Sequence, residues 1–353
     1  CDIDLKLDQR AVAIDPDTKC VTTVRGNEIG YDKLVLAHGG QQFIPPIEGI
    51  DLPGVFSCKQ LSETERLKAH GGRRAVVIGS GAIGIEVAEA LQKRGYRVTV
   101  VELLDWVLPA LFDHETARRL EVRLSAGKIR ILTSERVLAI EGNGKVAAVT
   151  TDKRRLNCDT VVIATGVVPG VALAQTAGID IDRGIKVNDH MQTGVPDIYA
   201  CGDCVETVDA CTGEDVMFQL KHNALDQAAV VAQNLLGRET GYAGAYAFAR
   251  VHFHHTHAAT FGKTTLATHC ELGRLRIVEK EKGGDYLRLI LKDDQIVGGQ
   301  AMGTFAGHIG FFIGAMRRND DFEQLRRDWT AVRSPLAIHR WPQRLMGEVM
   351  GFP

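Results

Sequence analysis

The sequence predicts an α/β fold with a mostly parallel sheet, followed by a mixed α+β region towards the end of the chain. Between residues 71 and 190, short runs of β-branched and aliphatic residues alternate with stretches of helix formers. This alternation is typical of parallel strands joined by helices. After residue 246 the pattern changes to a series of short strands with two late helices, which indicates a separate mixed region.

The composition fits a globular protein of more than one domain. The chain has 353 residues, of which 45% are hydrophobic and 24% charged, and this length favours two or three cores over one. The formal net charge is −2, so bulk electrostatics do not favour nucleic acid or an anionic membrane as a partner. No apolar run could cross a bilayer and no leader opens the sequence, and we expect a cytoplasmic protein. The eight cysteines are expected mainly as buried thiols.

The first 70 residues predict short strands joined by turns. Residues 11–14 and 20–24 are apolar or β-branched and flank Asp15-Pro16-Asp17, which has turn chemistry. Residues 34–37 are expected to form a buried strand that ends at Gly39-Gly40. A Pro/Gly-rich connector over residues 45–54 then predicts a crossing between domains.

Apolar runs and helical spacing predict the elements of the remaining chain. The expected strands cover residues 75–78, 97–102, 129–132, 146–150, 160–164, 260–267, 275–279, 287–291 and 296–299. The expected helices cover residues 85–94, 115–125 and 225–236; Gly95 stands at the C-terminal cap of the first and Gly237 stops the third.

The most informative motif spans residues 76–84, Val-Val-Ile-Gly-Ser-Gly-Ala-Ile-Gly. A G-x-G-x-x-G pattern is weak alone, but this one follows a buried strand, opens a helix and precedes a strand that ends in an acid. Gly79 permits the tight turn, Gly81 lets the backbone approach a pyrophosphate, and Gly84 lets the helix pack on the strand. Ser80, Ala82 and Ile83 complete a loop whose free N–H groups favour an anion.

The motif therefore predicts a Rossmann-type dinucleotide-binding domain. The alternative is a glycine turn that binds nothing, and the whole strand–loop–helix context argues against it. Glu102, at the end of the next strand, is expected to accept hydrogen bonds from the adenosine ribose. A carboxylate there repels a 2′-phosphate and the next residues are Leu103 and Leu104, so NAD(H) is favoured over NADP.

Three further segments accompany the glycine loop. Residues 31–39 (Tyr-Asp-Lys-Leu-Val-Leu-Ala-His-Gly), 165–169 (Thr-Gly-Val-Val-Pro) and 198–203 (Ile-Tyr-Ala-Cys-Gly-Asp) occur in an order that resembles the pyridine nucleotide-disulfide oxidoreductase family. The resemblance extends from about residue 10 into the C-terminal region. It is strongest to NADH oxidases, coenzyme A disulfide reductases, rubredoxin and ferredoxin reductases, and nitrite reductase flavoproteins.

The resemblance implies a domain plan. A Rossmann-type NAD-binding domain over residues 71–190 would be inserted into a partial FAD-binding domain made of residues 1–70 and 191–245. Residues 246–353 would form an α+β interface domain through which two copies pair as a homodimer.

The resemblance also implies roles for individual residues. Gly202 and Asp203 would bind the FAD ribitol, and the N-terminus of the helix near His222 would point towards the flavin. Strand-end turns would be formed by Ala37, His38 and Gly39 and by Gly166. Glu86 would lie near the nicotinamide; alternatively, it is a first-turn carboxylate that complements the helix dipole.

The implied activity is that of an NADH-dependent flavoprotein oxidoreductase. Hydride would pass from NADH to FAD, and electrons would leave to oxygen, a disulfide, or a rubredoxin- or ferredoxin-type electron carrier. The sequence departs from the family in lacking the first glycine fingerprint, for the ADP half of FAD, and the active-site cysteine segment, so we expect a chain without its front end. The alternative is a non-catalytic dinucleotide-binding or assembly subunit whose FAD-binding half is absent or supplied by another chain.

Several clusters allow more than one interpretation. Cys201 and Cys204 have dithiol spacing but are expected to be small buried residues beside a turn. Histidines at positions 252, 254, 255 and 257 would alternate between two faces of one strand, which disfavours a shared metal. We expect polar residues at a domain or subunit interface there, and no metal site. The resemblance to ferredoxin reductases, whose matching stretch approaches the flavin, implies a role at the flavin edge as the alternative. Residues 153–155 are expected in a solvated hairpin turn, and the arginine pairs at 317–318 and 326–327 could form a basic face for an acidic carrier.

Overall fold

The computed structural model describes residues 3–264 and 275–331. The chain divides into two compact units: Cys1–Gln41 with Val167–Ala247, and Gln42–Gly166 with Phe248–Pro353. The second unit contains the predicted parallel sheet, and its C-terminal part is a mixed α+β region, so the predicted fold class is confirmed. No helix in the described part of the chain is long and apolar enough to cross a membrane.

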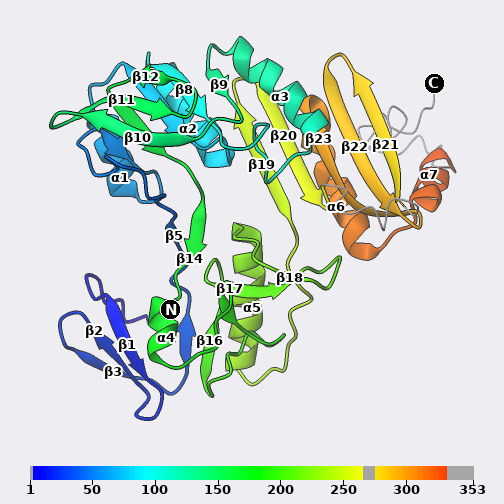
Figure 1. Cartoon of the computed structure of the whole chain (residues 1–353). Coiled ribbons are helices and arrows are strands. Elements are labelled where there is room, and N and C mark those ends of the chain that lie inside the picture. The colour runs from blue at the N-terminus through cyan, green and yellow to red at the C-terminus, as the bar shows by residue number, and fades with distance from the viewer. Residues whose placement is uncertain (1–2, 265–274, 332–353) are drawn as a thin grey trace. The chain divides into compact units, whose positions relative to one another are not determined.

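The first unit is built from small sheets and one long helix (Figure 1). An antiparallel sheet has the order β1-β2-β3, a parallel pair joins β4 to β16, and a third sheet has the order β15-β17-β18. The strands are β1 (Ala11–Asp15), β2 (Cys20–Thr23), β3 (Glu28–Gly30), β4 (Leu34–Leu36), β5 (Gly40–Gln42), β14 (Val167–Pro169), β15 (Ile185–Lys186), β16 (Ile198–Ala200), β17 (Val205–Val208) and β18 (Asp215–Val216). The helices are α4 (Ala172–Thr176) and α5 (Lys221–Leu235).

Helix α5 begins four residues before the predicted start. The first turn is fixed by Asn223, which is buried and whose side chain accepts a hydrogen bond from the Tyr246 N–H and donates one to the Tyr246 carbonyl. Such a contact between distant segments leaves no trace in local apolar spacing. Buried residues of the helix, Val230 and Val231, belong to the same core cluster as Leu36 and Ile198 of the parallel pair.

The second unit contains a five-stranded sheet in the order β6-β13-β7-β8-β9, in which every neighbouring pair is parallel. Its strands are β6 (Val55–Phe56), β7 (Arg74–Ile78), β8 (Arg97–Val101), β9 (Arg130–Leu132) and β13 (Thr160–Ile163). The helices of this part are α1 (Leu61–Ala69), α2 (Ala82–Lys93) and α3 (His114–Ala126), and an antiparallel meander is formed by β10 (Val137–Gly142), β11 (Val146–Thr151) and β12 (Arg155–Asn157).

Local sequence explains this βαβ core. Four consecutive residues of β7, from Ala75 to Ile78, are buried, as expected for a central parallel strand. Helix α2 starts directly after the N-cap Gly81, and Gly95, with φ of +89°, follows its C-terminal end. Helix α3 begins at an aspartate cap, because the Asp113 carboxylate accepts a hydrogen bond from the Thr116 N–H at 2.8 Å.

The C-terminal part of the second unit is an antiparallel sheet in the order β19-β20-β23-β22-β21, with helices beside it (Figure 1). Its strands are β19 (Phe248–Phe253), β20 (Thr256–Gly262), β21 (Leu275–Lys282), β22 (Asp285–Lys292) and β23 (Gln295–Met302). The helices are a 3₁₀ turn (Gly303–His308), α6 (Ile309–Arg318) and α7 (Phe322–Ala331). Strand β20 starts four residues before the predicted strand 260–267, whose last three residues lie outside the described part of the chain.

Candidate functional site

The three glycines of the motif after β7 each lie where a side chain would either clash with the backbone or occupy open space next to it. Gly79 has φ of +101°, and a Cβ there would lie 2.4 Å from the Ala164 carbonyl oxygen. A Cβ on Gly84 would lie 2.1 Å from the Gly79 carbonyl oxygen, so the helix and the turn approach closely here. A Cβ on Gly81 would meet no atom within 4 Å. The backbone at Gly81 is therefore open to an approaching ligand, and the first N–H groups of α2 follow it.

Glu102 lies directly after β8 and is only 7% exposed. Its Oε2 atom accepts hydrogen bonds from the Ser80 N–H at 2.8 Å and from the Ser80 hydroxyl at 2.7 Å. Its Oε1 atom accepts one from the Leu104 N–H at 2.9 Å. A carboxylate has about four acceptor positions, so these three donors orient the group and leave about one position for a hydroxyl of a ligand.

A cavity of about 740 Å³ lies at the carboxyl edge of the parallel sheet, between the glycine loop and Glu102. This volume is within the usual range of ligand pockets, about 300–1,000 Å³. Carboxyl-terminal strand ends are where open α/β sheets bind ligands. Apolar side chains dominate its wall and are suited to the flat face of a base: Phe43, Pro45, Pro46, Ile47, Leu103, Leu104, Val137 and Leu138.

Gly166 lies at this cavity together with Thr165, whose hydroxyl donates to the Phe43 carbonyl oxygen at 2.7 Å. The structure therefore places Gly166 in the second unit, whereas Ala37, His38 and Gly39 belong to the first. Phe43 and Arg136 line the cavity but were not predicted as site residues. Neither belongs to a recognisable motif, and each reaches the cavity through tertiary folding.

Glu86 lies in the second turn of α2, because the helix begins at Ala82 and not at residue 85. The alternative of a first-turn carboxylate is therefore wrong, since the dipole effect falls off within the first turn. The side chain is exposed, but partial burial raises the pKa of the Glu86 carboxyl, while a hydrogen bond from the His252 N–H acts in the opposite direction. The Glu86 side chain thus contacts the backbone of strand β19 from its position on α2.

In the first unit the structure brings together the remaining predicted residues. The turns Ala37–Gly39 and 201–203 follow β4 and β16, which are parallel neighbours, and the Cys201 N–H donates to the Leu36 carbonyl at 3.0 Å. The Gly202 N–H donates to Gln227 of α5 at 2.7 Å, and Gln219, just before α5, donates to the Asp203 carbonyl oxygen at 3.1 Å. The Gly202-Asp203 turn therefore lies beside the beginning of α5.

The histidines of this group are engaged within the first unit. His38 Nε2 makes a short contact with the Gly170 carbonyl oxygen, which holds the ring against the chain segment after β14. His222 Nε2 lies 2.9 Å from the Tyr246 carbonyl oxygen, so its ring helps to fix the first turn of α5. These contacts give both histidines a structural role beside the strand-end turns.

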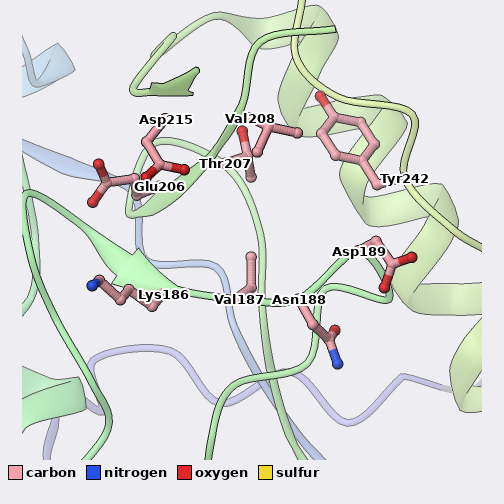
Figure 2. A pocket seen from close by; sticks show the side chains of 9 residues that line it. All are labelled: Lys186, Val187, Asn188, Asp189, Glu206, Thr207, Val208, Asp215 and Tyr242. Carbon is pink, nitrogen blue, oxygen red and sulfur yellow. The ribbon is translucent and has the colours of Figure 1, made fainter. Parts of the chain in front are cut away.

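The first unit also holds a smaller cavity of about 260 Å³, which contains none of the predicted site residues. Figure 2 shows the segment 186–189 facing Glu206, Thr207 and Val208 across it, with Tyr242 at one end. The buried Glu206 carboxylate is bound by Arg183, whose guanidinium also donates to the Asp215 carbonyl oxygen at 2.7 Å. The Glu206 carboxylate is thus committed to the fold.

Cys201 and Cys204 are both free thiols buried beside the Gly202-Asp203 turn. Burial raises the pKa of Cys201 and raises that of Cys204 to about 11. The Cys204 thiol donates to the Cys201 carbonyl oxygen at 3.3 Å. A protonated, buried thiol is a poor nucleophile, and this favours the interpretation as small buried residues.

The histidine cluster does not lie on one continuous strand. His254 has φ of +41° and forms the turn between β19 and β20, so the predicted division of the four rings between two strand faces is wrong. The His254 N–H donates to the buried Glu89 carboxylate at 2.6 Å, which fixes the turn against α2. His252 and His257 face each other across the hairpin with ring centroids 4.5 Å apart. Among the residues placed by the structure, no three His, Cys, Asp or Glu side chains are grouped so as to hold a metal.

The other basic segments differ in how their charges are engaged. Residues 153–155 lie at the hairpin between β11 and β12, as predicted, and Arg155 pairs with Glu141 at 2.7 Å. In the predicted basic face, Arg318 pairs with Asp320 at 2.6 Å and Arg327 donates to Gln324 at 3.0 Å. The Arg326 side chain lies outside the described part of the chain, so the basic face stays a prediction.

Comparison with known proteins places these features in a family. The family model described as pyridine nucleotide-disulphide oxidoreductase matches residues 2–228. An NADH oxidase of Methanocaldococcus jannaschii is 40% identical over 231 residues, which cover 64% of this chain and 51% of that protein. A CoA-dependent NAD(P)H sulfur oxidoreductase of Pyrococcus furiosus is 36% identical over 251 residues, covering 69% of this chain and 56% of that protein. The chain thus spans about half the length of these relatives.

Solved structures show the same likeness. A NAD-dependent persulfide reductase from A. fulgidus superposes with a TM-score of 0.85 at 31% identity, covering 92% of this chain and 64% of that one. An FAD-dependent pyridine nucleotide-disulphide oxidoreductase from Desulfovibrio vulgaris superposes with a TM-score of 0.80 at 30% identity, covering 97% of this chain and 90% of that one. By motif order, fold and family match, the chain belongs to the pyridine nucleotide-disulfide oxidoreductase family.

Proposed function

We propose that the protein is an NADH-dependent flavoprotein oxidoreductase that passes electrons from NADH through FAD to an acceptor. The observation that carries the proposal is the glycine loop, with its open backbone at Gly81, beside a cavity that Glu102 enters from the next strand. We retain the division into an NAD-binding domain (71–190), a partial FAD-binding domain (1–70 and 191–245) and a C-terminal interface domain (246–353).

The second unit has the features needed to hold NADH. The N–H groups at the start of α2 would bind the pyrophosphate next to Gly81, where no side chain blocks its approach. The remaining acceptor position of Glu102 would take a ribose hydroxyl, and the apolar wall would cover the adenine. Glu86, in the second turn of α2, would lie towards the nicotinamide end, and partial burial raises the pKa of its carboxyl.

The first unit has features that fit FAD. Two strand-end turns, Ala37–Gly39 and 201–203, lie next to each other at the beginning of α5. Asp203 would bind hydroxyls of the ribitol, and the α5 N-terminus, at Lys221 and His222, would stabilise negative charge on the flavin ring. Bound together, NADH supplies a hydride and FAD accepts it, and the protein supplies proximity and orientation.

The acceptor is proposed to be oxygen, a disulfide or a small electron-carrier protein. Relatives of this chain include an NADH oxidase, a CoA-dependent sulfur oxidoreductase and a rubredoxin-NAD(+) reductase of Pseudomonas putida. The buried, protonated thiols of Cys201 and Cys204 argue against a disulfide exchange centre at that turn. We also propose a cytoplasmic homodimer that pairs through the C-terminal domain, as the family resemblance implies.

An anaerobic spectroscopic titration tests this proposal. The purified protein, reconstituted with FAD, is mixed with NADH under argon, and the flavin absorbance near the visible maximum is followed. We expect stoichiometric bleaching by NADH, and recovery of the absorbance when the correct acceptor is added. FAD binding without any bleaching, or no FAD binding at all, would favour the non-catalytic alternative.

A further inference from the structure

The second unit contains another cavity, at the opposite edge of the parallel sheet from the glycine loop. Its volume is about 420 Å³, which is within the usual range of ligand pockets, about 300–1,000 Å³. Strand β8 separates it from the nucleotide cavity by about 13 Å, the length of five extended residues. We call it the amino-edge cavity. It is lined by the end of α2, the start of β8 and the segment leading into β9: Gln92, Gly95, Tyr96, Arg97, Val98, Thr99, Lys128 and Arg130.

The local sequence places cations at this edge. Helices α2 and α3 both return the chain to the amino edge of the sheet, and each is followed by a glycine and then by basic residues. Arg97 follows the first helix, and Lys128 and Arg130 follow the second. Arg130 is the parallel partner of Thr99, two residues after Arg97, so these three side chains point to the same face of the sheet. The two connections therefore bring three cations into one wall.

These three charges are not neutralised by ion pairs. Among residues 3–264 and 275–331, no carboxylate pairs with the side chains of Arg97, Lys128 or Arg130, and none lines the cavity. All three residues are exposed. Asp159, an acid at the same edge of the sheet, accepts the Arg74 N–H at 3.1 Å and acts on the charge of that arginine. The wall therefore carries positive charge without a counter-ion.

A simpler role for these cations is to stabilise the ends of the two helices. The C-termini of α2 and α3 each carry about half a negative charge, which a nearby cation stabilises. Two helix ends thus balance about one positive charge, whereas the wall holds three cations. A net positive charge of about two is left, and the cations repel one another until an anion lies between them. Helix capping alone does not account for this wall.

We propose that the amino-edge cavity binds a small polyanion that carries two or more phosphate groups. Arg97 and Arg130 would each bind phosphate oxygens through parallel N–H groups, and Lys128 would add a third charge. Gln92 and Thr99 can donate further hydrogen bonds from an amide and a hydroxyl of the same wall. The inference goes beyond the proposed function, because the two cavities share no lining residue.

The spacing of the two arginines favours a chain of phosphates over a single one. Arg97 and Arg130 lie one strand and two residues apart, so their backbones are separated by about 8 Å. A chain of two or three phosphates spans this gap, whereas one phosphate would have to draw both side chains together. Inorganic polyphosphate and nucleoside triphosphates both supply such a chain.

Isothermal titration calorimetry tests the proposal on the full chain saturated with NADH, with sodium tripolyphosphate as the probe. NADH occupies the glycine loop, so the probe cannot use that anion site. We expect one tripolyphosphate per chain, with a Kd that rises with salt because ions screen exposed charges. A parallel titration with UTP distinguishes the two sources: tighter binding of UTP identifies a nucleotide, and tighter binding of tripolyphosphate the inorganic chain.

Single substitutions locate the bound anion. Arg97→Gln and Arg130→Gln should each raise the Kd of tripolyphosphate about 3- to 10-fold, less than for a buried charge pair because both side chains are exposed. The matched control is Arg118→Gln, which removes the same charge from an exposed arginine of α3 outside the cavity wall. It should leave the Kd unchanged, and the melting temperatures confirm that all variants fold.

The outcomes separate this inference from the proposed function. Wild-type protein that binds NADH but not tripolyphosphate would overturn the inference alone, as would equal effects of Arg97→Gln, Arg130→Gln and Arg118→Gln. Protein that does not bind NADH would contradict the proposed function, and the same variants are then compared without NADH. Weaker tripolyphosphate binding in the two cavity variants, with an unchanged Kd of NADH, is the result that the inference predicts.

Discussion

Replacing Ser80 with alanine removes one of the three hydrogen bonds that hold the Glu102 carboxylate. Ser80 is fully buried, and its hydroxyl donates to Glu102 Oε2 at 2.7 Å. The Ser80 N–H and the Leu104 N–H remain as donors to the carboxylate. The Leu108 N–H, which contacts the Ser80 hydroxyl at 3.3 Å, keeps its bond to the Ser80 carbonyl at 3.0 Å. The substitution thus removes one defined interaction and leaves the backbone of the loop supported.

The expected size of the effect follows from these contacts. A hydrogen bond to a charged group contributes about 1.5–3 kcal/mol, and we expect the lower end because Glu102 keeps two donors. The free energy of unfolding should therefore fall by about 1.5 kcal/mol. The less restrained carboxylate must then be ordered when NADH binds, at a cost of about 0.5–1.5 kcal/mol. We expect the Kd of NADH to rise roughly 2- to 10-fold.

Urea denaturation measures the stability change, and calorimetric titration with NADH measures the Kd. The matched control is Ser125→Ala, at an exposed position of α3, which should change neither quantity. A Ser80→Ala variant with unchanged stability and unchanged NADH affinity would refute the argument that the Ser80–Glu102 pair organises the site.

Three further predictions follow from single residues. Gly84→Val places a Cβ 2.1 Å from the Gly79 carbonyl oxygen. The resulting overpacking should lower the free energy of unfolding by about 1–3 kcal/mol and raise the Kd of NADH. An unchanged melting temperature together with an unchanged Kd of NADH would contradict this. Burial raises the pKa of Asp159, but N–H groups of Arg74 and Arg73 outweigh it and hold the pKa below its usual value. Its stabilising effect is therefore present above the unfolded-state pKa of about 3.9 and is lost as the pH falls through the lower folded pKa. Asp159→Asn should be less stable than wild type at neutral pH, and urea denaturation should show this gap narrowing as the pH falls below about 3.9; a gap that stays constant with falling pH would contradict it. Cys204→Ala should keep NADH-dependent flavin reduction, measured anaerobically, because burial holds this thiol protonated; loss of reduction in a folded variant would show a redox role.

The sequence was sufficient to predict the nucleotide-binding core because its signals are local. The buried run of β7, the glycine loop, the helix and Gly95 lie within about 20 consecutive residues, and each is constrained by its own backbone geometry. The predicted strand 97–102 differs from β8 (Arg97–Val101) only at its last residue. Motif order extended this result to the family, although no single motif outside the loop would have established it.

Features that depend on contacts between distant segments were missed or misplaced. The turn at His254 is fixed by Glu89, which is 165 positions away in sequence, and no alternation of polar and apolar residues encodes that bond. The first turn of α5 depends on Asn223 bonding to Tyr246. Arg136 followed a short strand without any motif, and only the backbone bond between Glu135 and Glu102 shows why it lies at the cavity.

The most direct test of the central claim is a crystal structure of the protein with NADH. The account predicts the pyrophosphate over Gly81 at the start of α2, and a hydroxyl of the adenosine ribose within hydrogen-bond distance of Glu102 Oε1. Saturating NADH bound elsewhere, with this cavity empty and Glu102 in contact only with Ser80 and Leu104, would contradict it.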